Sequence, residues 1–196
     1  IVKHVFKNKN GLAFKLMENG AIFSIEYNNI LINQIYGSPL EGNLNNIYLR
    51  IHKDKSIFFT PLIGPSSDSK FFYTKNKAAW QGQFEGIAYE CILNPDNKKN
   101  IWYWAINLLN NSDNAKEIDL VYAQDIAIAD KGAVRNNEAY VCHYIDHFIE
   151  KHDKYGYTML SRQNQFQGKV HPWIMQGSIN KKITGYLTDG FQFFGL

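Results

Sequence analysis

The stretch IWYWAINLLNNSDNAKEIDLVYAQDIAIAD, residues 101–130, carries the strongest structural signal in the chain. Apolar side chains recur at every second position on both sides of a polar run, which is the period of a strand with one buried face. The polar run at residues 110–114 contains short side chains that bond their own backbone and stabilise turns. We therefore expect two long strands joined as a hairpin. Trp102 and Trp104 need a covering layer, so a second sheet must pack on this hairpin.

Further strands are expected on both sides of this stretch. Residues 12–17 and 21–27 flank Asn19-Gly20, a pair that is typical of a tight hairpin turn. Apolar alternation or short apolar runs predict additional strands at residues 30–36, 47–52, 57–60, 71–73, 87–93 and 157–160. Residues 161–177 are interpreted as a long loop, and residues 183–196 as a strand, a turn at 188–190 and an apolar end.

Residues 139–149 combine strand spacing with helix spacing, and their β-branched and aromatic side chains favour a strand. The fold class that follows is all-β, with two antiparallel sheets in a single β-sandwich domain over residues 1–196. Because the chain stops within an apolar pattern, we expect a sandwich that is truncated and belongs to a larger enzyme.

Composition excludes several classes of protein. The chain has 196 residues, 45% of them hydrophobic and 20% charged, as in a globular protein with one core. A net charge of +3 with interspersed signs predicts neither a nucleic-acid nor a membrane partner. Cys91 and Cys142 lie in apolar runs, so we expect two reduced thiols in a cytoplasmic protein. The sequon at residues 110–112 is interpreted as a turn.

Titratable residues offer weak candidates for catalysis. His143, His147 and His152 invite a metal site, but on a strand the first two would lie about 13 Å apart, too far to share an ion. Sugar hydrolysis needs two carboxylates flanking one bond, and the spacing of the acidic residues selects no pair. The residues alone therefore select no catalytic pair, and we predict no metal ligand and no cofactor in this chain.

The polar and aromatic stretch SRQNQFQGKVHPW, residues 161–173, is the best candidate for a binding site. Amide and guanidinium groups beside an aromatic ring suit the hydroxyls and the apolar faces of sugar rings. The candidate substrate-binding residues are Arg162, Gln163, Asn164, Gln165, His171 and Trp173. The same residues also fit a loop whose polar groups satisfy their own backbone and whose tryptophan closes the edge of the sandwich, and residue types alone favour neither interpretation.

Several segments resemble one known family, in order along the chain. They are NGAIFSIEYNNILINQIYGSPLEGNLNNIYLRIH, FTPLIGPSS, NEAYVCHYIDH, SRQNQFQG with HPWIMQGS, and TDGFQFFG. Together they are similar to the N-terminal region of bacterial 1,2-β-oligoglucan phosphorylases. That family belongs, with cellobiose phosphorylase and the C-terminal region of cyclic β-1,2-glucan synthase, to glycoside hydrolase family 94.

The resemblance implies a β-supersandwich of the galactose-mutarotase type, followed in full-length relatives by linker helices, an (α/α)6 catalytic barrel and a jelly roll. Those enzymes are inverting phosphorylases, in which one carboxylic acid protonates the leaving oxygen and inorganic phosphate, as co-substrate, attacks the sugar. The acid lies in the barrel, so this chain alone is expected to be inactive. Its implied partners are a β-glucan oligosaccharide, its own downstream catalytic domain and a second copy in a homodimer.

The residues and the resemblance together suggest three hypotheses for the function of this chain. The first is a non-catalytic N-terminal domain of a phosphorylase or synthase acting on β-1,2-glucans. The second is an independent carbohydrate-binding module. The third is a mutarotase-like enzyme, which would need a histidine and a carboxylate as acid–base pair in one cleft.

Overall fold

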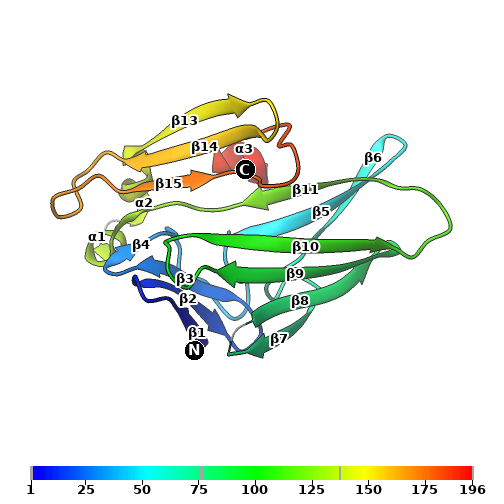
Figure 1. Ribbon diagram of the computed structural model, residues 1–196, viewed down its shortest axis with the longest axis horizontal. Helices are drawn as coiled ribbons and strands as arrows, with labels where there is room; N and C mark the ends of the chain where they lie inside the picture. Colours follow the sequence, from blue (N-terminus) through cyan, green and yellow to red (C-terminus); the bar gives the residue numbers. More distant parts are fainter. Residues whose placement is uncertain (1, 76, 137, 196) are drawn as a thin grey trace. The chain divides into compact units, whose positions relative to one another are not determined.

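The computed structural model describes residues 2–75, 77–136 and 138–195, and most of its regular structure is antiparallel β-sheet (Figure 1). The chain divides into two compact units, unit 1 (Ile1–Ile126) and unit 2 (Ala127–Leu196). The strands of unit 1 are β1 (Val2–Lys7), β2 (Leu12–Met17), β3 (Ile22–Tyr27), β4 (Ile30–Leu31), β5 (Asn46–Lys53), β6 (Ser56–Pro61), β7 (Lys70–Thr74), β8 (Lys77–Phe84), β9 (Ile87–Pro95), β10 (Trp102–Asn110) and β11 (Glu117–Ala123).

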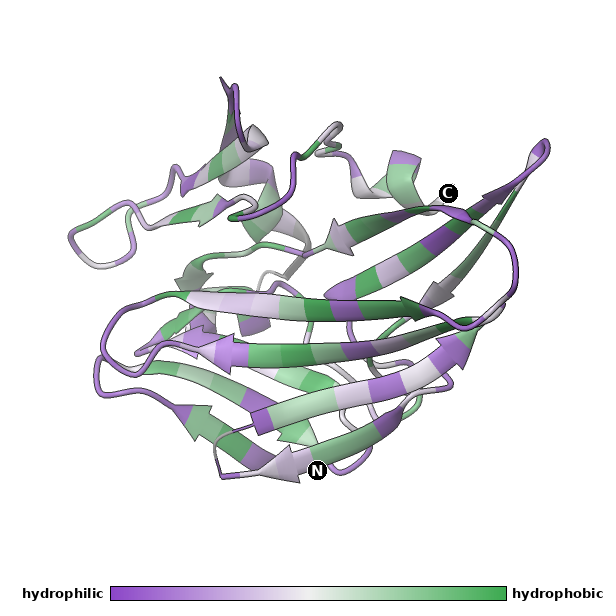
Figure 2. Ribbon diagram, turned by 45° about the vertical axis from the view of Figure 1, so that its right-hand side comes forward, coloured by the Kyte–Doolittle hydropathy of each residue, from purple (hydrophilic) through white to green (hydrophobic). Residues whose placement is uncertain are grey.

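The strands of unit 1 pair in the orders β1-β2-β3-β4, β10-β9-β8-β7 and β11-β5-β6. Aromatic contacts join the first two sheets: the Phe14 and Trp102 ring centroids lie 5.4 Å apart, and Trp80 Nε1 donates a hydrogen bond to Gly20 O at 3.2 Å. Along β9, alternate side chains from Ile87 to Leu93 are buried in the core, as predicted. Figure 2 shows hydrophobic and hydrophilic residues as bands along the strands.

The hairpin predicted around Asn19-Gly20 is confirmed, because β2 and β3 pair antiparallel and Gly20 has a positive φ of 78°. The Gly20 backbone also lies against Trp80 and Phe71, so a Cβ at this position would be 2.5 Å from Trp80 Nε1. The turn therefore needs glycine both for its conformation and for its close packing.

The predicted hairpin of residues 101–130 is wrong in its pairing, although both strands exist. β10 pairs with β9 over its whole length, and β11 pairs with β5, so the polar run connects two different sheets. Ile118 faces Ile51 and Tyr122 faces Ile47 across the β11–β5 ladder. Apolar alternation predicts that a strand exists, but several strands offer matching apolar faces and the alternation does not choose among them. Residues 126 and 128 are buried beyond the end of β11.

Only the start of the strand predicted at residues 30–36 forms a ladder. After β4, the side chain of Asn33 takes over the backbone bonding: its Oδ1 accepts from Ile25 N at 2.7 Å and its Nδ2 donates to Ile35 O at 2.6 Å. A buried amide thus replaces strand pairing at this point.

Unit 2 has short helices beside a three-stranded sheet of order β13-β14-β15. Its elements are β12 (Ala129–Asp130), α1 (Lys131–Asn136), α2 (Glu138–Val141), η1 (Cys142–Tyr144), β13 (Ile145–His152), β14 (Gly156–Gln163), β15 (Trp173–Gln176) and α3 (Gly190–Phe194). Val134, Val141 and Ile174 are among its buried apolar residues.

Three predictions in unit 2 need correction. Residues 139–149 are helical up to Tyr144 and a strand only from Ile145 onward. The predicted loop of residues 161–177 is a hairpin, since its first residues end β14 and residues 173–176 form β15. The predicted strand after residue 183 is absent from the described residues. Instead, Asp189 Oδ1 accepts from Phe191 N at 2.9 Å and caps α3.

The chain is therefore mostly β with antiparallel sheets, as predicted, but it also contains short helices, and its described strands form four sheets where two were expected. The galactose-mutarotase-like supersandwich and the single domain stay predictions. Cys91 is buried and Cys142 half-buried, and both are free thiols. Among the described residues, no helix combines the length and apolar character needed to span a membrane.

Candidate functional site

The predicted substrate-binding residues lie on β14, on β15 and on the loop between these strands in unit 2. Arg162 sits opposite Asp146 on one side and opposite Trp173 on the other in the strand register. Because side chains alternate along a strand, Phe148 and Met175 point to the same face as these three residues. We call the group of Phe148, Leu160, Arg162, Trp173 and Met175 the Trp173 platform.

Two aromatic rings and Met175 form the exposed surface of the platform. The Phe148 and Trp173 ring centroids lie 5.6 Å apart with an interplanar angle of 28°. Their side chains stay 44% and 53% exposed, which is unusual for large apolar groups held on regular strands. Such a stacked pair offers a flat apolar face to a ligand.

Arg162 is held over part of the Trp173 ring by several contacts. Its guanidinium carbon lies 5.5 Å from the Trp173 ring centroid. Its Nη2 donates to Asp146 Oδ2 at 2.9 Å and to Asn164 Oδ1 at 2.6 Å. Hydrogen bonding by Asn164 and Arg162 lowers the pKa of Asp146, so the carboxylate stays ionised and keeps the arginine in place.

Gln163 and His171 make hydrogen bonds within unit 2. The Gln163 side chain is fully buried, and its Nε2 donates to Ala127 O at 3.1 Å and to Val141 O at 3.2 Å. His171 Nδ1 donates to Gln163 O at 3.0 Å, and its ring packs on Phe166 at 4.1 Å between centroids. Both residues therefore position the loop between β14 and β15.

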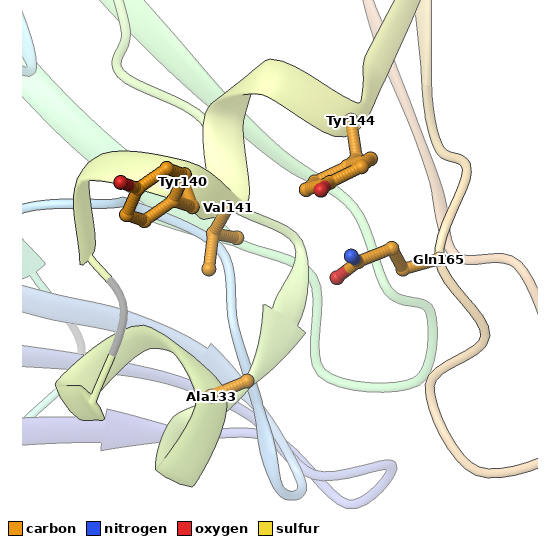
Figure 3. A pocket seen from close by; sticks show the side chains of 5 residues that line it. All are labelled: Ala133, Tyr140, Val141, Tyr144 and Gln165. Atoms are coloured by element: carbon orange, nitrogen blue, oxygen red, sulfur yellow. The ribbon is translucent and has the colours of Figure 1, made fainter.

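Gln165 lines a small cavity at the helical end of the unit (Figure 3). The cavity has a volume of about 240 Å³, and Tyr140 and Tyr144 form its aromatic walls. Asn164 N donates to Tyr144 O at 2.7 Å, which anchors the loop beside the cavity. The two tyrosines were missed as site residues because residues 139–149 were interpreted as a strand. The helical spacing of Val141, Ile145 and Ile149 was the available signal.

The histidines considered for a metal are dispersed. His143 is in η1, whereas His147 and His152 are on β13. His147 Nδ1 lies 2.8 Å from Ser161 Oγ, and burial lowers the pKa of this imidazole. Within the part of the chain that the structure describes, no three His, Cys, Asp or Glu side chains gather as metal ligands would.

A histidine–carboxylate pair, which the mutarotase hypothesis requires, occurs in unit 1. His52 Nε2 lies 2.7 Å from Asp119 Oδ2, and Arg50 binds both oxygens of the same carboxylate. The hydrogen bond from Arg50 is the main cause that lowers the pKa of Asp119. The pair lies on strand faces of β5 and β11 and does not line the cavity beside Gln165. A carboxylate whose two oxygens are both bound by Arg50 is a weak base, which argues against this hypothesis.

This geometry is that of a β-rich protein with an exposed aromatic platform. A family model described as "SOGP N-terminal domain" matches residues 15–196, so the chain belongs to this family. A curated relative, the 1,2-beta-oligoglucan phosphorylase of Listeria innocua serovar 6a, is 32% identical over 187 residues. The alignment covers 95% of this chain but 16% of the relative, so the chain spans about a sixth of that protein's length.

Proposed function

We propose that this chain is a non-catalytic N-terminal domain of an enzyme acting on β-1,2-glucans, in which it supports the catalytic barrel and the homodimer. The observation that carries the proposal is the family match over residues 15–196 together with the named relative, of which the chain covers only a small part. Inorganic phosphate would be a co-substrate of the whole enzyme and would react outside this chain.

The state of the carboxylates supports a non-catalytic role. A general acid needs a raised pKa and an open path to its substrate. Hydrogen bonds from cationic or amide partners lower the pKa of Glu90, Asp119 and Asp146, which is the opposite tendency. Burial raises the pKa of Asp125 to about 6, but this carboxyl accepts hydrogen bonds from the Gln34 and Ile35 backbone inside unit 1.

Exposed apolar side chains in unit 2 support a packing role within a larger protein. Large apolar groups exposed in such density mark surfaces that another protein part covers. They include Tyr140, Phe148, Phe166, Val170, Trp173, Met175, Ile179, Tyr186, Leu187 and Phe191. We expect the catalytic barrel to cover part of this surface.

The Trp173 platform and the Gln165 cavity are the proposed contacts with a β-glucan oligosaccharide. A sugar ring can stack on the exposed Trp173 indole while Arg162 and Asn164 bond its hydroxyls. This geometry also favours the second candidate function, an independent carbohydrate-binding module, because the platform is complete within unit 2.

An activity assay tests the non-catalytic proposal. The 196-residue chain, incubated with 1,2-β-oligoglucans and inorganic phosphate, should release no glucose 1-phosphate. Release above that of a heat-denatured sample would overturn the proposal.

Calorimetry with the same oligoglucans separates the packing role from the binding module. Binding by the isolated chain that Trp173→Ala abolishes supports a module, whereas absence of binding supports a purely structural domain. Phe59→Ala is the matched control, because Phe59 is an exposed aromatic residue on β6 in unit 1.

A further inference from the structure

A row of polar side chains crosses three neighbouring strands of unit 1. In the strand register Gln81 on β8 lies beside Glu90 on β9, and Glu90 lies beside Asn107 on β10. The residues that flank Glu90 along β9, Tyr89 and Cys91, are buried, so the row points away from the core. A cavity of about 370 Å³ opens beside the row. Its lining residues are Gln81, Gly82, Ala88, Tyr89, Glu90, Asn107, Leu108 and Leu109.

Glu90 organises the polar side of this cavity. Its Oε1 accepts from Lys77 Nζ at 2.9 Å and from Gln81 Nε2 at 2.8 Å, and its Oε2 accepts from Asn107 Nδ2 at 3.2 Å. The side-chain amides of Gln81 and Asn107 thus each donate one N–H to the carboxylate. Their carbonyl oxygens and second N–H groups have no bonding partner among the described residues, and they remain for a ligand.

The charge of the cluster selects the kind of ligand. The hydrogen bond from Lys77 is the largest cause that lowers the pKa of Glu90, followed by that from Gln81, so the carboxylate stays ionised beside an ammonium group. The two charges cancel, and the cluster therefore favours neither a cation nor an anion. Two amides beside a carboxylate match the mixed donors and acceptors of neighbouring hydroxyl groups.

The other sides of the cavity are apolar and firmly supported. Leu109 and Tyr103 lie on the same face of β10 as Asn107 and are 62% and 49% exposed. They are six positions apart along the strand, a distance of about 20 Å, and of the two only Leu109 lines the cavity itself. Beneath the cavity, the Tyr89 ring packs against Gly82, where a Cβ would lie 2.4 Å from the tyrosine Oη. The Tyr89 hydroxyl is fixed by a 2.8 Å hydrogen bond with Ser69 Oγ.

We propose that this cavity over β8, β9 and β10, which we call the groove, is a binding site for a neutral carbohydrate chain, with Gln81, Glu90 and Asn107 bonding its hydroxyls. Leu109 and Tyr103 then contact the apolar faces of the sugar rings. The site lies entirely in unit 1, and it is independent of the Trp173 platform.

An NMR titration of the ¹⁵N-labelled chain tests the proposal, with 1,2-β-oligoglucans as the first probe and cello-oligosaccharides as the second. We expect saturable shifts of the Gly82, Ala88 and Leu109 amides with at least one probe. The Trp173 indole signal reports the platform separately, so failure at one site is distinguishable from failure at the other. Unchanged groove amides at tens of millimolar of both probes overturn the proposal. If the same amide signals shift with protein concentration in the absence of sugar, the proposal is also overturned, because a second copy of the chain then occupies the groove.

Matched variants identify the groups responsible. Gln81→Ala and Asn107→Ala should each weaken binding at the groove about fivefold, the value of one hydrogen bond of about 1 kcal/mol. Gln83→Ala should leave it unchanged, because Gln83 is an amide on the same strand that does not line the cavity. Equal weakening by all three variants would overturn the assignment. The titration of the unmodified chain stands even where a variant fails to fold.

Discussion

The guanidinium carbon of Arg162 lies 5.5 Å from the Trp173 ring centroid, and the two residues are direct partners across the β14–β15 ladder. The pairing places a cation over the face of an indole that is 53% exposed. Because both side chains stand on strands, their positions are set by backbone register, and the sheet itself orders this surface.

Fluorescence quenching should identify Trp173 as the accessible tryptophan. Trp80 is fully buried, and Trp102 and Trp104 are half-buried. Among the four tryptophan-to-phenylalanine variants, Trp173→Phe should therefore cause the largest drop in the Stern–Volmer slope with acrylamide. Trp80→Phe is the control and should not lower the slope. An unchanged slope for Trp173→Phe would show that the platform is covered in the isolated chain.

The strands of unit 1 could largely be predicted from sequence because local patterns determine them. Alternation from Ile87 to Leu93 predicts the buried face of β9, and Asn19-Gly20 predicts the β2–β3 turn, since both signals lie within a few residues. The partner of β10 could not be predicted in the same way. Pairing of β10 with β9 and of β11 with β5 depends on which apolar faces meet in three dimensions.

The helical segments of unit 2 could not be predicted from sequence, because their residue types are equally typical of turns or strands. Asp189 before Gly190 is typical of a turn, yet its carboxylate also caps the first turn of α3. At the candidate site, the residue types at 162–173 indicated polar and aromatic contacts. Their partners Phe148 and Asp146 are in register from another strand, which no pattern within residues 161–173 reveals.

Replacing Gln163 should destabilise the fold far more than replacing Gln165. Gln163→Ala removes the donor to two buried carbonyl oxygens and the acceptor for Gln165 N. We expect a loss of about 2–3 kcal/mol in the free energy of unfolding, measured by urea denaturation. The exposed Gln165 is the control, and Gln165→Ala should stay within about 0.5 kcal/mol of the unmodified chain. Equal effects would mean that the Gln163 amide is dispensable.

Thiol reactivity should distinguish the two cysteines. Burial raises the pKa of the Cys91 thiol and removes it from solvent, whereas Cys142 is half-buried. In the folded Cys142→Ser variant, Ellman's reagent should react only as fast as the chain unfolds. The Cys91→Ser variant should react faster under the same conditions, and both should react fully in urea. Rapid labelling of folded Cys142→Ser would show that the core around β9 opens readily.

Asp125 should make the fold less stable as the pH rises. Burial raises the pKa of this carboxyl from 3.8 to about 6 in the folded state, and its Oδ1 is buried without a hydrogen-bond partner among the described residues. A raised folded-state pKa means that the protonated form is the favoured one. The stability it contributes is complete below about pH 4 and is lost as the pH rises through 6, by up to about 3 kcal/mol.

The Asp125→Asn variant isolates this contribution. Its amide oxygen can still accept from the Gln34 and Ile35 N–H groups, but it cannot ionise. Relative to the unmodified chain, the variant should therefore gain stability between pH 4.5 and pH 7.5 in urea unfolding, because the difference cancels the other titrating groups. Asp119→Asn is the control, because the contribution of Asp119 to stability should change with pH in the opposite direction. The hydrogen bond from Arg50 lowers the pKa of Asp119, so this variant should be most destabilised at pH 7.5 and less so as the pH falls toward 3. A pH-independent difference for Asp125→Asn would show that its carboxyl is solvated in the folded chain.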